Sequence, residues 1–320
     1  MSRLGQRMRN WIRGVDRSVT PVIGTILVVA IIVVIAAAFG AVAFGFTDRL
    51  GSTETASADR CGVSEFDPED VDGFAKSESE LYSVPCVTWF DASTLEYEDG
   101  DSVSRWDDRS ASRFDAVSVA GTGNPTYRSS IDGVAAVEFD SSDGGDGLAT
   151  KKNASDANLA GETELSISAV VRPTSATTNP FARIGDPGNN KFRFTYNETT
   201  GPGDWYLSPG AGQVTHEPND VIDEWTLVTY VHDGETVRVY VNGKRQTILD
   251  LGGSELGYTF DADLDIADSP LILGYTGTTK LDGAIAEVVF FDKALTDDER
   301  RSIECTMDEK YKGSVTIDGC

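Results

Sequence analysis

The sequence predicts a mainly β molecule: an N-terminal membrane helix, then an antiparallel β-sandwich, then a closing C-terminal helix. Three observations lead to this fold class. Residues 18–47 contain no charged side chain. From Cys86 onward, short apolar runs alternate with turns rich in Gly, Asp, Ser and Pro. Residues 296–311 combine a helix-capping signal with an amphipathic repeat. The helices and the sandwich are therefore expected to be separate parts of the chain.

The uncharged segment 18–47 is long enough to cross a membrane, since its helix would reach roughly 45 Å and a bilayer core is about 30 Å thick. The basic leader, residues 1–17, holds five Arg and one Asp. Positive flanks stay in the cytoplasm, so the chain after about Thr47 is expected outside the cell. Three fates fit this helix: a secretory signal cut near Ala41–Ala43, a plain anchor, or an assembly helix. A signal of about 7–15 apolar residues would be much shorter, which disfavours the first fate.

The segment from Arg17 to Gly24 reads RSVTPVIG and passes directly into a run of Val, Ile and Ala. The leader, the Pro–Gly spacing and the apolar run together resemble the N-terminus of archaeal type IV pilins. This resemblance implies processing between Arg17 and Ser18, followed by assembly with other pilin-like subunits through residues 18–47. Bacterial type IV pilins carry Glu where this chain has Val22, so the archaeal pattern is the one that fits.

Composition gives the molecule a strongly acidic surface. The formal net charge of the 320 residues is −25, and loss of the leader, with its charge of +4, takes it to −29. Such a surface repels nucleic acid and anionic membranes, so no nucleic-acid partner is expected. A halophile surface, which stays hydrated in high salt, explains this excess better than a store for cations does.

All four cysteines lie on the predicted outer side, where disulfides are the default. We expect the pairs Cys61–Cys86 and Cys305–Cys320, because Cys305 should point away from the buried helix face and within reach of the tail. The alternative, Cys86–Cys305 with Cys61–Cys320, stays open, since terminal segments of a sandwich often lie side by side. Asn-X-Ser/Thr sequences at Asn153 and Asn197 predict N-glycosylation.

Residues 48–85 are polar and acidic and are expected to form a connector. The outer domain is predicted over residues 86–320, with Asn242-Gly243 as a hairpin turn. Thr296 and Glu299 form a capping box, and Ile303, Met307 and Tyr311 define one apolar helix face. The expected strands are 86–93, 113–120, 134–140, 165–173, 191–197, 205–208, 224–232, 236–241, 245–251, 271–275 and 283–292. Strict alternation, as at 165–169, predicts half-buried antiparallel strands.

Three groups of segments then become recognisable: 89–93 with 103–110, 224–228 with 239–244, and 271–274 with 281–288 and 294–296. They resemble the laminin-G-like, concanavalin A-like jelly-roll family, in family order. The resemblance implies a jelly roll with Trp89 and Trp225 as core residues and Gly283 at a bend. The fold does not give a function by itself.

Together, these observations predict a pilin-like, surface-displayed adhesion protein at the cell membrane, whose outer jelly roll binds glycans or other surfaces. A single-pass carbohydrate-binding receptor that does not polymerise is the first alternative. A surface glycanase is the second, since some family members place catalytic carboxylates on alternate residues of a strand. Only 65–69 and 263–268 imitate that spacing, and neither provides the Glu pair on a central strand, so no enzyme activity is expected.

Calcium is the ligand that the laminin-G resemblance implies. Asp140, Asp143 and Asp146 recur at three-residue spacing in the glycine-rich loop DSSDGGDG. Carboxylate oxygens on a flexible loop suit calcium, although a solvated acidic loop would look the same.

Overall fold

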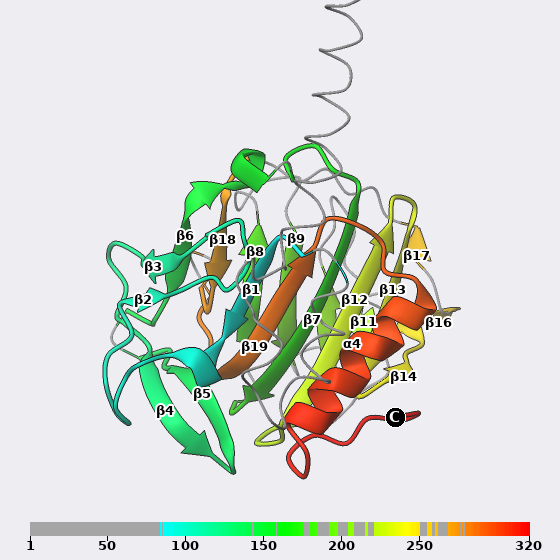
Figure 1. The fold of residues 1–320 in the computed structure, drawn as a ribbon. Helices are drawn as coiled ribbons and strands as arrows, with labels where there is room; N and C mark the ends of the chain where they lie inside the picture. The colour runs from blue at the N-terminus through cyan, green and yellow to red at the C-terminus, as the bar shows by residue number, and fades with distance from the viewer. Residues whose placement is uncertain are drawn as a thin grey trace, which may run out of the picture. The chain divides into compact units, whose positions relative to one another are not determined.

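Two β-sheets face each other, and one long helix lies on the outer face of the larger sheet (Figure 1). The protein is seen here as a computed structural model. It describes residue 84 and residues 86–142, 144–157, 159–175, 179–184, 192–197, 204–207, 215–216, 221–249, 255–257, 260–261, 268–275, 277 and 279–320. The leader, the uncharged segment and the connector up to residue 83 lie outside this set. Within the described part, no helix is long and apolar enough to cross a membrane.

The larger sheet, sheet A, has nine strands in the order β14-β13-β12-β7-β19-β5-β4, with β1 paired to β19 and β17 paired to β13. These strands are β1 (Thr88–Asp91), β4 (Thr126–Ile131), β5 (Val134–Phe139), β7 (Glu164–Pro173), β12 (Thr226–Asp233), β13 (Thr236–Val241), β14 (Lys244–Arg245), β17 (Phe260–Asp261) and β19 (Gly283–Phe291). The first strand of the domain, β1, therefore lies beside its last strand, β19, with Trp89 opposite Val289.

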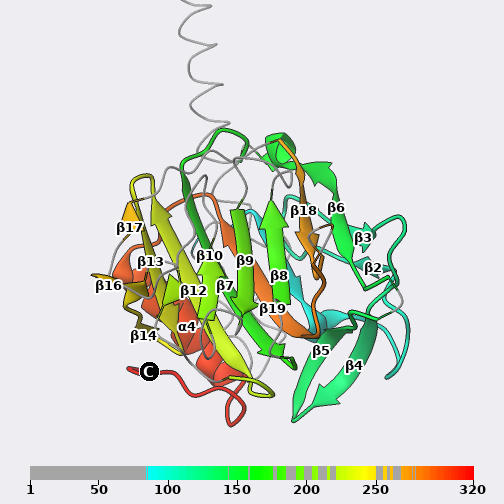
Figure 2. The same cartoon turned by 180° about the vertical axis from the view of Figure 1, so that it is seen from behind.

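Sheet B faces sheet A and has seven strands in the order β10-β9-β8-β18-β6-β3-β2 (Figure 2). They are β2 (Arg105–Trp106), β3 (Ala116–Ser118), β6 (Leu148–Asn153), β8 (Asn179–Ile184), β9 (Phe192–Asn197), β10 (Asp204–Leu207) and β18 (Pro270–Leu273). A small third sheet contains β11 (Thr215–His216), β15 (Ile248–Leu249) and β16 (Glu255–Gly257), and two 3-10 turns are η1 (Ala92–Thr94) and η2 (Ala154–Ala157). The pairings within these three sheets are antiparallel, as predicted.

The predicted strands are present, but β4, β6 and β8 were missed, as were the short strands β2, β11, β16 and β17. The sequences of β4 and β6, TYRSSI and LATKKN, are too polar to show an apolar pattern, and the short NPFARI of β8 shows no alternation although every residue in it is buried. The half-buried character predicted for 165–169 is wrong. Every residue from Leu165 to Val171 in β7 is buried, and so is every residue of β19, because α4 (Asp297–Lys310) covers the outer face of sheet A.

The buried side chains form two layers, one on each side of sheet A. The layer between the sheets contains the largest aromatic groups, including Phe90, Trp106, Phe139, Phe181, Phe194 and Phe290. The layer beneath α4 contains Trp89 and Trp225 together with Ile303, Met307 and Tyr311 of the helix face. The two Trp residues are core residues, as predicted, and both belong to the layer that contains the buried face of α4 rather than to the layer between the sheets.

The local signals for α4 and for the β13–β14 turn are confirmed. The Thr296 hydroxyl accepts from the Glu299 backbone N–H, and the Glu299 carboxylate accepts from the Thr296 backbone N–H. Asn242 and Gly243 have φ angles of 50° and 77°, as a tight hairpin turn requires. Gly283 allows β19 to lie close to β7 rather than marking a bend, since a Cβ at this position would lie 2.5 Å from the Arg172 carbonyl oxygen.

Candidate functional site

A buried cluster of charged groups joins β1, β19 and α4. The Glu287 carboxylate is 0 % exposed. It accepts hydrogen bonds from Trp89 Nε1 at 2.6 Å, Lys310 Nζ at 2.7 Å and Tyr311 Oη at 2.7 Å. Lys310 Nζ also donates to Asp91 at 2.8 Å, and the Arg109 guanidinium donates to the same carboxylate at 2.6 Å. Because every one of these groups has a partner, the cluster stabilises the fold and offers no site.

The charges in this cluster shift the pKa values of its members. Burial works to raise the pKa of Asp91, but the charges of Lys310 and Arg109, with hydrogen bonds from Lys310 and Ser93, hold it below its usual value. Burial works to lower the pKa of Lys310, and the carboxylates of Glu287 and Asp91 outweigh burial and raise it. Both groups are therefore charged across the neutral pH range.

The turn that follows β2 is held by Asp108, another buried carboxylate. It accepts from the backbone N–H groups of Trp89, Ser110 and Phe114 at 2.7–2.9 Å. Burial raises the pKa of Asp108, and these hydrogen bonds oppose the rise. The motif from 103 to 110 thus fixes β1 against the loop after β2, which is a structural role.

The predicted calcium loop lies at one end of the sandwich. The Asp146 carboxylate accepts from the Asp140 backbone N–H at 2.9 Å, and the Asp140 carboxylate accepts from the Ser142 N–H at 2.7 Å. Burial raises the pKa of Asp146, helped by the nearby charge of Asp140, while the Ser142 N–H lowers the pKa of Asp140. Asp143 lies outside the described residues. No group of three or more metal-binding side chains occurs in the described part. Calcium takes 6–8 oxygens, which two described carboxylates do not supply, so calcium stays a prediction.

The predicted pair Cys305–Cys320 is present as a disulfide, with Cα atoms 5.2 Å apart. It excludes the alternative pairing through Cys305. Cys86 is also disulfide-bonded, and Cys61, its expected partner, lies outside the described residues. The disulfide fixes the C-terminal tail beside α4 and the β13–β14 turn, where both views of the fold show it (Figures 1 and 2).

A groove of about 470 Å³ lies between this tail and the β13–β14 hairpin. Val221, Val241 and Ile317 give it an apolar floor. The polar lining residues are Asn242, Lys244, Gln246, Thr316 and Asp318, with Gly319 completing the wall. The volume falls within the range of about 300–1,000 Å³ that is typical of small-ligand sites.

Backbone contacts hold the two walls of the groove together. The Asp318 N–H donates to the Asn242 carbonyl at 2.9 Å, and the Leu227 N–H donates to the Asn242 side-chain oxygen at 2.9 Å. A Cβ at Gly243 would lie 2.6 Å from Ile317 and 2.7 Å from the Asp318 carbonyl, so only glycine lets the tail come this close. The groove is therefore pre-formed.

Several polar groups of the groove are available to a ligand. The Lys244 ammonium, the Asp318 carboxylate and the Thr316 hydroxyl are exposed and make no hydrogen bond to any described residue. The sequence did not predict this site. The Asn-Gly turn and the final cysteine mark its two walls, but only the folded chain brings them together.

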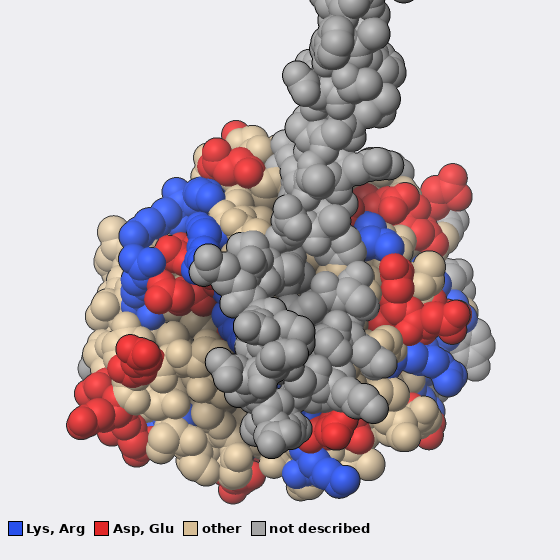
Figure 3. Space-filling view, in the orientation of Figure 1, with Lys and Arg blue, Asp and Glu red and all other residues tan. Residues whose placement is uncertain are grey.

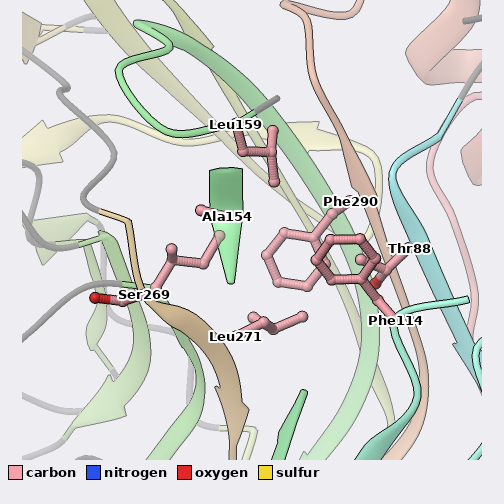
Figure 4. A pocket seen from close by; sticks show the side chains of 8 residues that line it. Thr88, Phe114, Ala154, Leu159, Ser269, Leu271 and Phe290 are labelled. Atoms are coloured by element: carbon pink, nitrogen blue, oxygen red, sulfur yellow. The ribbon is translucent and has the colours of Figure 1, made fainter. Parts of the chain in front are cut away.

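A second cavity lies inside the layer between the sheets (Figure 4). It has a volume of about 10 Å³, enough for about one water molecule. Its lining is Thr88, Phe114, Ala154, Leu159, Ile184, Ser269, Leu271 and Phe290. The side chains of Figure 4 converge from both sheets and are almost all apolar. This cavity is a packing defect and too small to be a ligand site.

The remaining predicted residues are separate from the groove. Asn153 is exposed at the end of β6, and Asn197 ends β9. The carboxylates at 65–69 and those at 263 and 265 lie outside the described residues. Asp268 is exposed and accepts from the Ser155 N–H at 3.1 Å.

Comparison with known families assigns both parts of the chain. Residues 17–59 match the family described as archaeal type IV pilin, N-terminal. Residues 142–299 match the concanavalin A-like lectin/glucanases superfamily. The chain joins an archaeal type IV pilin N-terminus to a concanavalin A-like head. Both predicted resemblances are thereby confirmed, and the outer domain is called the head from here on.

No curated protein matches the chain. Among solved structures, the head is similar to domain 4 of AbnA, a GH43 extracellular arabinanase from Geobacillus stearothermophilus, in complex with arabinotriose. The identity is 16%, the match covers 65% of this chain and 100% of that domain, and the TM-score is 0.46. It is also similar to the binding domain of botulinum neurotoxin DC in complex with SialylT, at 12% identity, 69% and 51% coverage and a TM-score of 0.48.

Trypanosoma rangeli sialidase is a third similar structure, at 16% identity and a TM-score of 0.45. The match covers 69% of this chain but only 32% of the sialidase. All three TM-scores lie below 0.5.

Proposed function

We propose that the chain is a surface-displayed, pilin-like adhesion protein whose head binds glycans. The leader is removed between Arg17 and Ser18, and residues 18–47 then join other pilin-like subunits. The head lies outside the cell. The match of residues 17–59 to archaeal pilins and the leader of five Arg support this part of the proposal. An anchored receptor that does not polymerise is the alternative.

The groove between the C-terminal tail and the β13–β14 hairpin carries the binding part of the proposal. Sugar hydroxyl groups donate to carboxylates and accept from ammonium and amide groups, and the apolar ring faces lie well on aliphatic side chains. Asp318, Lys244 and Asn242 provide those polar groups, and Val241 and Ile317 provide an apolar floor. The disulfide keeps this arrangement fixed, which lowers the entropy cost of binding.

The same lining supports binding without cleavage. Glycoside hydrolysis uses two carboxyl groups about 5–10 Å apart on either side of the scissile bond. Among the described residues that line the groove, Asp318 is the one carboxylate. The proposal is therefore a lectin-like head that holds a glycan and does not hydrolyse it.

The test is binding of the full chain, in detergent, to a panel of neutral, uronic-acid-containing and sulfated oligosaccharides. The variant Lys244→Ala with Asp318→Asn should bind any glycan found at least tenfold more weakly. A matched control, Lys312→Ala with Glu309→Gln, changes the same charges at exposed positions of α4 and the tail and should bind normally. Equal binding by both variants would place the ligand elsewhere. Release of shorter sugars would show an enzyme instead.

A further inference from the structure

A basic patch lies on one edge of this acidic head. It consists of Arg105 on β2, Arg113 in the turn before β3, and Lys151 and Lys152 on β6. Arg105, Arg113 and Lys151 are exposed. Figure 3 shows Lys and Arg atoms gathered on the side of the head where β2, β3 and β6 lie in Figure 1.

Two positive charges of this patch form no ion pair with the described residues and are available to a binding partner. Arg105 pairs with Asp107 and with Asp115, the latter at 2.7 Å. Lys152 donates to the Ser112 carbonyl and lies over the Phe114 ring. Arg113 and Lys151 form no ion pair with any described residue. Two cations of the patch are thus unneutralised by the head itself, in a chain with 52 acids and 27 bases.

An acidic turn lies next to the patch along the same edge. It consists of Glu96, Glu98, Asp99 and Asp101, all exposed. Asp101 and Asp99 accept from the backbone N–H groups of Glu98 and Ser129 at 2.9 and 2.8 Å, which fixes the turn. None of the four carboxylates forms an ion pair with a described residue.

The chain itself holds the two clusters at a fixed spacing. Ser102 to Ser104 alone separate Asp101 from Arg105, and the Tyr97 hydroxyl donates to the Arg105 carbonyl at 3.1 Å. The segment after η1, drawn in cyan, runs below β2 in Figure 1, and Asp and Glu atoms lie below the blue group in Figure 3. The edge therefore carries positive charge at one end and negative charge at the other.

From this arrangement we propose that the edge pairs with the same edge of a second copy of the chain. A twofold axis perpendicular to the line between the clusters places each basic patch on the partner's acidic turn. Such an interface uses one surface twice, as twofold dimers do. It also brings opposite charges together between heads that otherwise repel each other at −29 per processed chain. This inference goes beyond the proposed function and does not depend on glycan binding.

The experiment measures energy transfer between donor-labelled and acceptor-labelled full chains in excess detergent. The salt is the lowest that preserves the circular dichroism of the folded head. A patch variant, Arg113→Glu with Lys151→Glu, reverses the two cations without an ion pair and leaves Arg105 and Lys152 in place. A turn variant, Glu96→Lys with Glu98→Lys, removes the net negative charge of the turn, since Asp99 and Asp101 remain, and neither glutamate side chain accepts a hydrogen bond from a described residue. Arg301→Glu with Lys312→Glu reverses two exposed charges elsewhere.

We expect transfer between wild-type chains and between control chains. Each edge variant should associate with itself at least tenfold more weakly. A mixture of the patch variant with the turn variant should regain transfer, because the unchanged basic patch of the turn variant then meets the unchanged acidic turn of the patch variant. That rescue also shows that both variants are folded.

Equal transfer in every combination would mean that residues 18–47 alone associate, and the proposal would be wrong. Failure of the mixture to regain transfer would contradict it as well. The proposal would also be contradicted if wild-type chains showed no energy transfer but bound a sulfated polysaccharide that the patch variant does not bind. The patch would then be a binding site for a polyanion.

Discussion

The two layers on either side of sheet A bury their side chains by different means. Between the sheets, Phe90, Trp106, Phe194 and other apolar groups pack against one another. Beneath α4, equally buried positions include Asp91 and Glu287, which Lys310 bridges at 2.8 and 2.7 Å. A sheet can bury charged side chains on the face where a packed helix provides side chains of the opposite charge to pair with them. The stability contributed by the layer between the sheets should therefore be independent of pH, whereas the stability contributed by the layer beneath α4 should depend on pH.

The largest effect is expected from removing the cation shared by the buried carboxylates. Lys310→Met keeps most of the side-chain volume but leaves Glu287 with hydrogen bonds alone. Loss of one partner from a buried pair costs about 3–5 kcal/mol, because the remaining charge is uncompensated. Thermal unfolding followed by near-UV circular dichroism measures the loss. The control Lys312→Met, two residues further and exposed, should change stability by less than about 0.5 kcal/mol.

The apolar layer should give a loss of a different kind. Leu273 is fully buried between the sheets, so Leu273→Ala should cost about 2–5 kcal/mol through lost transfer energy and a new cavity. The cost should be the same at pH 5 and pH 8, since no titrating group is removed. A cost that changes strongly over this range would mean that the two layers are not independent.

Acid should loosen the layer beneath α4. The folded pKa of Asp91 lies below its ordinary 3.8, so its stabilisation is complete above that value and is lost as pH falls through the folded pKa. Lys310 acts at the other end, since its pKa lies above 10.5 and its contribution is lost as pH rises through the folded value. Other buried acids titrate too, so the melting curves of wild type and Lys310→Met are compared from pH 2 to 7. The difference between the two should shrink towards pH 2, and a constant difference would contradict the ionic account.

The smallest loss of stability is expected from removing the N-cap side chain of α4. Thr296→Ala removes the hydroxyl that accepts the Glu299 N–H, and loss of such a cap costs about 1 kcal/mol. Thr296→Ser keeps the hydroxyl and should stay within a few tenths of wild type. If both variants behave alike, packing of Ile303 and Met307 alone sets the position of the helix.

The sequence predicted those parts of the fold that short-range chemistry determines. The Asn242-Gly243 turn, the Thr296–Glu299 capping box and the helix face of Ile303 and Met307 all follow from neighbouring residues. Burial of Ser166, Ser168 and Glu287 could not be predicted, because alternation in a strand does not reveal that a distant helix will cover its polar face. Glu287 in particular depends on Lys310 and Trp89, which come from opposite ends of the head.

The candidate site was less accessible to sequence reasoning than the fold. The groove needs Asn242, Lys244 and the tail around Asp318 in one place, and their contact rests on the disulfide from Cys305 to Cys320. That pair was predicted, but nothing in its spacing indicated which strand the tail would touch. The sequence predicts the acidic segment around Asp140 and Asp146 as a loop, and the structure contains that loop. Its two described carboxylates accept hydrogen bonds from backbone N–H groups of the same loop.

Assembly through residues 18–47 requires processing at the pilin-type start of the chain, and the mature N-terminus of protein from isolated surface filaments tests it directly. We expect the sequence to begin at Ser18, within one residue, and the head to be recovered with the filaments. An intact Met1 would mean an anchored receptor, and an N-terminus near Ala43 would mean ordinary secretion. Either result would contradict assembly through residues 18–47.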